Sequence, residues 1–118
     1  MKAIFVELPV FSQYRDEYLS EEEFTALQNE MMKNPEAGDI IKGTGGLRKL
    51  RFADPARGKG KRGGLRVIYF WWDGRSQFWL FTLYNEDEMA DLNDKQKAAL
   101  KKMLTKELEA RDGKAKSV

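Results

Sequence analysis

Two apolar runs in the second half of the chain give the clearest structural signal in the sequence. They cover residues 65–72 and 75–84 and flank the pair Asp73-Gly74. An Asp-Gly pair between two apolar runs is a strong signal for a β-hairpin with a two-residue loop. Both faces of this hairpin are apolar over most of their length. We therefore expect other elements to cover each face.

A two-residue loop also fixes which residues face each other across the hairpin. In that register Arg66 lies opposite Phe81. Alternation along the strands then puts Arg66 and Phe81 on one face. It puts Tyr69, Trp71 and Tyr84 on the other face.

Other segments show strand or turn patterns. Residues 2–8 are rich in β-branched and aromatic residues and predict a short strand, and residues 47–52 predict another. Residues 38–41 fit a short extended piece followed by a turn at residues 44–46. In the strand over residues 47–52, Leu50 and Phe52 point inward. Period-two alternation sends Lys49 and Arg51 to the opposite face.

Three helices are expected. A short one covers residues 11–18, after Pro9 ends the first strand. Ser20 with Glu23 three residues on fits a capping box, and Asn34-Pro35 stops that helix near residue 33. Asn93 and Gln96 open a final helix over residues 93–110, followed by a frayed tail at residues 112–118.

The order of elements is a strand, helices, a run of antiparallel strands and a last helix. Such an order predicts an α+β fold, with helices packed on a twisted antiparallel sheet. The 118 residues fit one domain, spanning 1–118.

Charge is distributed unevenly, although the formal net charge is only +2. Residues 1–41 carry three bases and nine acids, and residues 67–118 carry nine of each. Residues 42–66 carry nine bases and one acid. One short internal segment therefore holds the basic excess.

The composition excludes several kinds of site. The chain has no Cys and no His, so it lacks thiolate ligands, a cysteine nucleophile and the commonest general base. The acids Glu86, Asp87, Glu88 and Asp91 precede a helix, where acids are expected in any case, so we expect no metal and no cofactor. The sequence shows no apolar run of about 20 residues and no signal-peptide pattern. We therefore expect a cytoplasmic protein without a membrane span.

The basic segment predicts a binding site for an anion. If the two strands pair, Lys49, Arg51 and Arg66 converge on one surface, joined by a glycine-rich basic loop. Tyr69, Trp71 and Tyr84 flank this surface, where bases could stack. The alternative for any single lysine or arginine is that it keeps a loop soluble. Composition alone does not separate RNA, DNA, a ribosome surface and an acidic protein as ligands.

These residues also form a pattern that resembles the RelE-type toxins, closest to the HigB branch of type II toxin–antitoxin systems. The pattern covers residues from about 3 to 108, and its most specific part is the run of Arg48-Lys49-Leu50-Arg51 and Gly60-Lys61-Arg62-Gly63-Gly64-Leu65-Arg66-Val67-Ile68-Tyr69. The pattern also includes Gly45-Gly46-Leu47, Gly58-Lys59, Leu83-Tyr84 and Asp91-Leu92. The resemblance implies a compact RelE-like domain. It also implies a metal-independent endoribonuclease, an mRNA interferase that cuts translated mRNA in the ribosomal A site.

The resemblance assigns roles to individual residues. Arg66 would bind the scissile phosphate, Lys49 and Arg51 would stabilise the transition state or orient the 2′-hydroxyl, and Tyr84 would stack on a base or transfer a proton. Contacts to RNA backbone or ribosomal RNA would come from the remaining basic residues of the segment, Arg48, Arg57, Lys59, Lys61 and Arg62. The implied partners are mRNA on the ribosome, ribosomal RNA and a HigA-like helix-turn-helix antitoxin.

One position departs from the pattern. Glu86 stands where relatives usually carry a basic residue after the last strand. Its carboxylate would either accept a proton or weaken activity. The open alternative is a non-catalytic protein of the same fold, either a ParE-like gyrase inhibitor or another nucleic-acid-binding module.

Overall fold

The structure is a computed structural model that describes residues 2–53, 64–89 and 91–116, with side chains up to Arg111. Its order of elements is β1 (Ile4–Glu7), α1 (Pro9–Tyr18), α2 (Glu21–Lys33), β2 (Asp39–Ile40), β3 (Arg48–Phe52), β4 (Leu65–Trp72), β5 (Gln77–Asn85) and α3 (Asp94–Lys116). The predicted α+β fold is confirmed.

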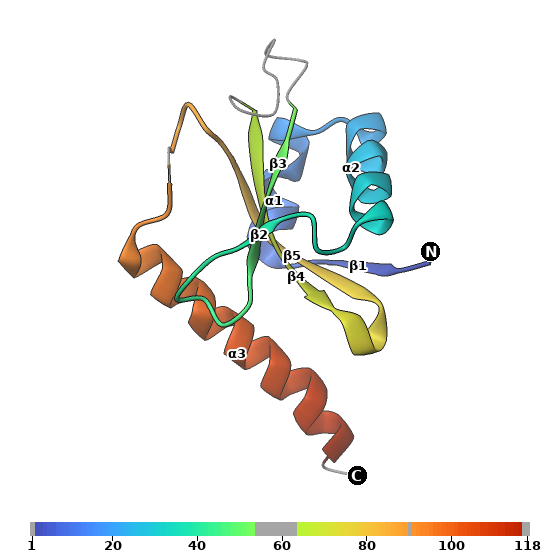
Figure 1. The fold of residues 1–118 in the computed structure, drawn as a ribbon, viewed down its shortest axis with the longest axis vertical. Coiled ribbons are helices and arrows are strands. Elements are labelled where there is room, and N and C mark those ends of the chain that lie inside the picture. Colours follow the sequence, from blue (N-terminus) through green and yellow to red (C-terminus); the bar gives the residue numbers. More distant parts are fainter. Residues whose placement is uncertain (1, 54–63, 90, 117–118) are drawn as a thin grey trace.

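Within the described residues the strands form one five-stranded sheet in the order β1-β5-β4-β3-β2 (Figure 1). Strands β2 to β5 pair antiparallel, as predicted. Strand β1 runs parallel to β5, so the sheet is mixed. Two helices lie between β1 and the rest of the sheet in the chain, and such a long connection allows parallel pairing.

Local signals set the starts of the helices. Ser20 Oγ accepts from Glu23 N at 3.1 Å, and the Glu23 carboxylate accepts from Ser20 N at 2.8 Å, which confirms the capping box. Asn93 and Gln96 make the same reciprocal pair before α3, at 2.8 and 2.9 Å. Helix α1 begins at Pro9, two residues before the predicted start, because proline suits the first turn of a helix. Helix α3 continues to Lys116, beyond the predicted end at residue 110.

Both faces of the sheet are covered, as the apolar hairpin predicts. On one face Tyr69, Phe78 and Leu80 pack with Phe11 of α1 and Leu27 of α2. On the other face a second cluster joins residues of the sheet to α3, and its buried members include Ile68, Trp79, Phe81, Tyr84, Leu100 and Leu104. Helices α2 and α3 lie apart, with the sheet between them (Figure 1).

The register of the hairpin differs from the prediction. The β4–β5 connection spans residues 73–76, because Trp72 pairs with Gln77. A bulge then interrupts the ladder, since Ile68 pairs with Thr82 but Tyr69 pairs with Leu80. The longer loop shifts the register by two residues, so each side chain stays on its predicted face of the sheet. The bulge adds one residue to β5, so the β5 side chains beyond it project to the face opposite to the predicted one.

This bulge relocates one predicted site residue. Arg66 pairs with Tyr84, whereas the predicted register placed Phe81 opposite Arg66. Tyr84 belongs to the cluster with Ile68 and Trp79, so its predicted placement beside Tyr69 was wrong. The bulge therefore brings Tyr84 to the face that carries Arg66.

Candidate functional site

Three of the predicted catalytic residues form a row across the sheet. Arg51 of β3 pairs with Arg66 of β4, and Arg66 pairs with Tyr84 of β5. Directly opposite residues on neighbouring strands project to the same face. Lys49 lies two residues before Arg51 on β3 and so shares this face, as predicted. The structure thus brings Lys49, Arg51, Arg66 and Tyr84 together on the α3 side of the sheet.

Arg66 is the buried centre of this row. Its side chain is 4% exposed, and its Nη2 lies 3.0 Å from the carboxylate of Glu86. Its Nη1 also donates to the carbonyl oxygen of Leu65 at 3.3 Å. A buried arginine needs such partners, because an unpaired charge in the interior costs several kcal/mol. Glu86 therefore occupies one edge of the guanidinium.

Tyr84 has a buried hydroxyl without a hydrogen-bond partner among the described residues. Burial raises the pKa of this phenol to about 12, with the charges of Asp91 and Glu86 adding to the rise and that of Arg66 opposing it. The hydroxyl thus stays protonated at neutral pH. It can donate a hydrogen bond or a proton, but it does not serve as a base there.

Lys49 forms an ion pair with a second acid, Asp91. Its Nζ lies 3.4 Å from the Asp91 carboxylate. That carboxylate also accepts from the backbone N–H of Leu92 at 2.8 Å. The Leu92 N–H first, and then Lys49, hold the pKa of Asp91 below its usual value of 3.8, against the opposing effect of burial.

Both acids come from the segment that follows β5. Backbone and side-chain bonds shape this segment: Asn85 accepts from Asp87 N at 2.9 Å and from Glu88 N at 3.0 Å. The hydroxyl of Tyr18 on α1 then donates to Glu88 at 2.9 Å. Glu86 and Asp91 are site residues whose contacts the sequence does not reveal. The sequence signals are that Glu86 stands where the resemblance expects a cation and that Asp91-Leu92 belongs to the pattern that carries the resemblance.

Other predicted residues lie elsewhere. The guanidinium of Arg48 donates to the Gly38 carbonyl at 2.8 Å and pairs with Glu36 at 3.0 Å, so it ties β3 to the segment after α2. Tyr69 donates to the Pro35 carbonyl at 2.7 Å, and Trp71 packs against the cluster under the helices. The prediction that Tyr69 and Trp71 flank the site was therefore wrong. The loop residues Arg57, Lys59, Lys61 and Arg62 lie outside the described residues.

At its Arg51 end, the row adjoins a charged hollow of about 300 Å³, hereafter the central hollow. It is lined by basic residues from β3, α3 and the segment after β2, together with two acids and two isoleucines: Lys42, Lys49, Arg51, Lys97, Asp39, Asp91, Ile40 and Ile41. In the described part of the chain, no three carboxylates cluster as metal ligands would. The hollow can accept an anion through its lysine and arginine side chains.

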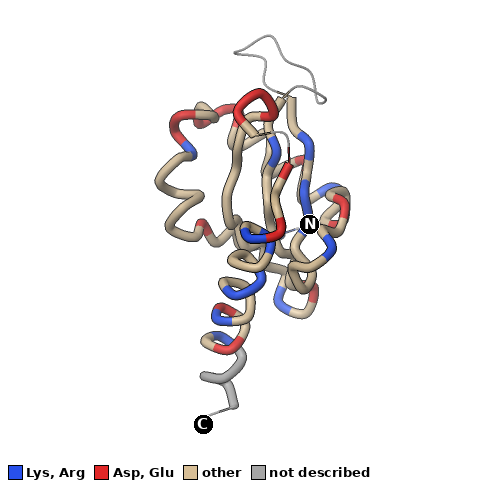
Figure 2. Tube along the Cα trace, turned by 90° about the vertical axis from the view of Figure 1, so that its left-hand side faces the viewer, with Lys and Arg blue, Asp and Glu red and all other residues tan. Residues whose placement is uncertain are grey.

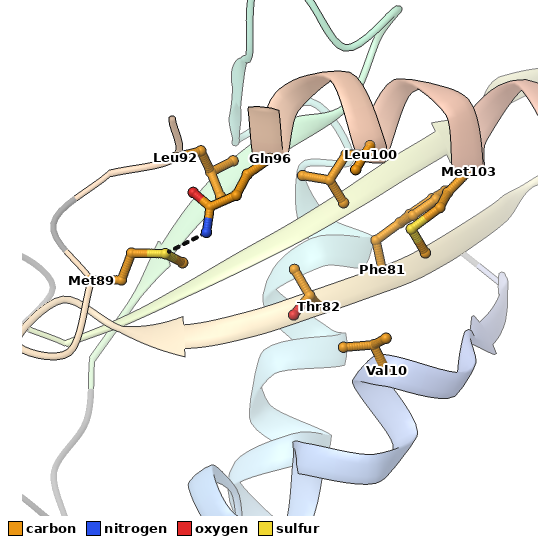
Figure 3. Close-up of a pocket in the computed structure, with 9 residues that line it drawn as sticks. Val10, Phe81, Thr82, Met89, Leu92, Gln96, Leu100 and Met103 are labelled. Atoms are coloured by element: carbon orange, nitrogen blue, oxygen red, sulfur yellow. Dashed lines mark hydrogen bonds between the residues drawn. The ribbon is translucent and has the colours of Figure 1, made fainter. Parts of the chain in front are cut away.

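A second cavity differs in character. It has a volume of about 240 Å³ and lies between α1, β5 and α3, lined mainly by apolar side chains such as Val10, Phe81 and Leu100 (Figure 3). The Gln96 amide contacts the Met89 sulfur at 3.2 Å. Among the described residues, no charged side chain lines this cavity, which distinguishes it from the central hollow.

Comparison with known proteins addresses the fold. No family model matches the chain. The fold is similar to that of a solved structure of the E. coli toxin RelE, a double mutant in the free state. The match has a TM-score of 0.50 and 16% sequence identity, and it covers 76% of this chain and 90% of RelE. The chain therefore has a RelE-like fold.

The described helices were also compared with the length and hydropathy of a membrane span. None of them is long and apolar enough to cross a bilayer.

Proposed function

We propose that this protein is a toxin of the RelE fold family, of the HigB-like branch, that cleaves translated mRNA in the ribosomal A site. The observation that carries the proposal is the row Arg51–Arg66–Tyr84, with Lys49 beside it, on one face of a RelE-like sheet. Three cations and one protonated phenol on one face of the sheet suit a phosphodiester. They supply positive charge where negative charge develops in the transition state.

The proposed reaction needs no group beyond these side chains and the RNA. The 2′-oxygen attacks the adjacent phosphorus, the bond from phosphorus to the 5′-oxygen breaks, and a 2′,3′-cyclic phosphate forms. Arg66, Lys49 and Arg51 stabilise the charge on the phosphoryl oxygens. Glu86, 3.0 Å from Arg66, accepts the 2′-hydroxyl proton. Tyr84, protonated at neutral pH, donates a proton to the departing 5′-oxygen.

The 2′-hydroxyl gives this scheme its preference for RNA, because DNA lacks the nucleophile. The proposed partners follow from the same scheme: mRNA on the ribosome, ribosomal RNA and a helix-turn-helix antitoxin that neutralises the toxin. The basic loop and Arg48 stay predicted contacts to RNA or ribosome. We expect the protein to act in the cytoplasm, where translating ribosomes are found.

A direct test uses purified protein and ribosomes stalled on a defined mRNA. Mapping of new 5′ ends should show cuts within the A-site codon. Arg66→Ala should abolish them. Arg75→Ala is the matched control, since Arg75 is an exposed arginine of the β4–β5 connection that packs over Trp72 at 4.9 Å. Absence of A-site cuts by the wild-type protein would overturn the proposal.

The Arg66–Glu86 ion pair favours one alternative. A cation already paired with a carboxylate fits a non-catalytic member of the fold, such as a ParE-like inhibitor of DNA gyrase. A gyrase supercoiling assay separates the two functions. An mRNA interferase leaves supercoiling unchanged, whereas a gyrase inhibitor blocks it and leaves mRNA on ribosomes intact.

A further inference from the structure

A basic groove lies against α3, next to the central hollow. It has a volume of about 500 Å³ and is lined by Lys42, Gly43, Asp94, Lys97, Ala98 and Lys101. Three of these six residues are lysines and one is an acid. Figure 2 shows basic positions both along α3 and on the strands above it. This α3 basic groove, defined by Lys42, Lys97 and Lys101, has no role in the proposed reaction.

One side of the groove is the turn between β2 and β3, which carries Lys42 and Gly43. In this turn the buried hydroxyl of Thr44 donates to the Ile41 carbonyl at 2.7 Å and accepts from Leu47 N at 3.2 Å. Gly43 and Gly45 have φ of +85° and +82°, in the left-handed region that favours glycine. These contacts hold the backbone that carries Lys42 in one conformation.

The same turn packs closely against α3. A Cβ added to Gly45 would lie 3.8 Å from side-chain carbons of both Lys101 and Leu104. On α3 itself, Lys97 and Lys101 are four residues apart and so share one face of the helix. Lys42 of the turn therefore lines the same groove as Lys97 and Lys101 of α3.

The groove continues into the site. The central hollow beside the row is lined by Lys42, Lys49, Arg51 and Lys97, so the two share Lys42 and Lys97. Cations thus follow one another from Arg51 at the row to Lys101 on α3. Asp39 and Asp91 line the central hollow, and Asp94 lines the groove, so acids offset only part of this charge.

This arrangement is unfavourable for the free protein. Like charges four residues apart on a helix repel each other. A ligand with regularly spaced negative charges removes that repulsion. A nucleic-acid backbone has such charges, and each contact of a lysine with a phosphate releases condensed counterions.

We propose that the α3 basic groove binds the phosphate backbone of the same RNA strand that crosses the row, and so leads single-stranded RNA along α3. The inference rests on the proposed function, because that function places a scissile phosphate at Arg66. It adds a second anchoring surface, formed by Lys42, Lys97 and Lys101.

The test compares two double variants that change the same helix by the same charge. Lys97→Gln with Lys101→Gln removes two cations of the groove. Lys102→Gln with Lys106→Gln removes two exposed lysines of α3 that line neither the groove nor the central hollow. The probe is a fluorescent single-stranded RNA with 2′-O-methyl groups, which cannot be cleaved by 2′-hydroxyl attack. Binding is followed by anisotropy over a range of salt concentrations.

The slope of log K against log salt is negative, and loss of two phosphate contacts should make it shallower by about 1.4 for the groove variant. The control variant should keep the wild-type slope. Equal slopes for the two variants would overturn the inference, as would a groove variant that loses affinity for polyglutamate but not for RNA. That second result would assign the groove to an acidic protein segment.

Cleavage on ribosomes, measured in parallel, separates this inference from the proposed function. If Arg66-dependent A-site cleavage occurs while the two double variants have equal slopes, the proposed function is supported and the proposed role of the groove is contradicted. If only the groove variant has a shallower slope while the wild-type protein makes no A-site cut, RNA binding by the groove is supported and the proposed function is contradicted.

Discussion

Removal of the Glu86 carboxylate should separate the binding of RNA from its cleavage. Arg66, with a side chain that is 4% exposed, keeps its charge in the variant Glu86→Gln but loses the anion 3.0 Å away. Breaking a fully buried ion pair costs about 3–5 kcal/mol. Because Glu86 is 31% exposed and glutamine still offers an oxygen to the guanidinium, we expect a loss of about 1–2 kcal/mol in unfolding free energy. Chemical denaturation measures this loss.

The same variant should bind RNA more tightly. Without Glu86, a phosphate no longer competes with a carboxylate for Arg66, so affinity for 2′-O-methyl RNA should rise several-fold. Cleavage of unmodified RNA should fall, since the proton acceptor is gone. The control is Glu109→Gln, which makes the same charge change at an exposed position of α3. Unchanged stability together with RNA affinity no higher than that of the control would refute the reasoning that Glu86 holds Arg66.

Three further variants test other parts of the structure. Tyr84→Phe should leave stability unchanged or raise it by about 1 kcal/mol, because the lost hydroxyl has no partner in the described residues, yet cleavage should fall at least tenfold; thermal melting and cleavage assays check this. The lowered pKa of Asp91 means that its ionised carboxylate stabilises the fold at pH values above the ordinary pKa, and that this stability is lost as pH falls through the lowered pKa. Asp91→Asn should therefore remove this part of the pH dependence of stability, as measured by denaturation from about pH 2 to 6. Gly38→Ala should cost about 1–3 kcal/mol in urea denaturation, since a Cβ would lie 3.0 Å from the backbone of Lys49 and the ring of Tyr69; a loss below about 0.5 kcal/mol would contradict this.

The parts of the fold that could be predicted from the sequence rest on contacts between near neighbours in the chain. The Ser20–Glu23 capping box is one such contact, and the Asn93–Gln96 pair is another. Alternation along β3 likewise placed Lys49 on the correct face. These signals need only a few consecutive residues, so the sequence carries them directly.

The bulge in the hairpin has no such local signal. It leaves Phe81 without a partner opposite it, because Ile68 pairs with Thr82 and Tyr69 with Leu80. The side chains that pack around it, such as Trp79, contact both the opposite strand and α3. Register there depends on packing between distant segments. The alternation therefore put Tyr84 on the wrong face, and its role at the site stays a prediction.

Contacts between remote charges were also missed. The pair Arg66–Glu86 joins residues 20 positions apart, and Lys49–Asp91 joins residues 42 positions apart. In the sequence, acids before a helix have a sufficient local explanation, which is the helix dipole. Only the closure of the sheet against α3 brings them to the cations.

The central claim is that RNA is cut through its own 2′-hydroxyl at the Arg66 row. The most direct measurement uses ribosomes stalled on two mRNAs that differ only by a 2′-O-methyl group at the A-site cleavage position. We predict that the wild-type protein cuts the unmodified mRNA, leaves a 2′,3′-cyclic phosphate and spares the methylated mRNA, and that Arg66→Ala cuts neither. Cleavage of the methylated mRNA, or cleavage by Arg66→Ala equal to that by the wild-type protein, would contradict the claim.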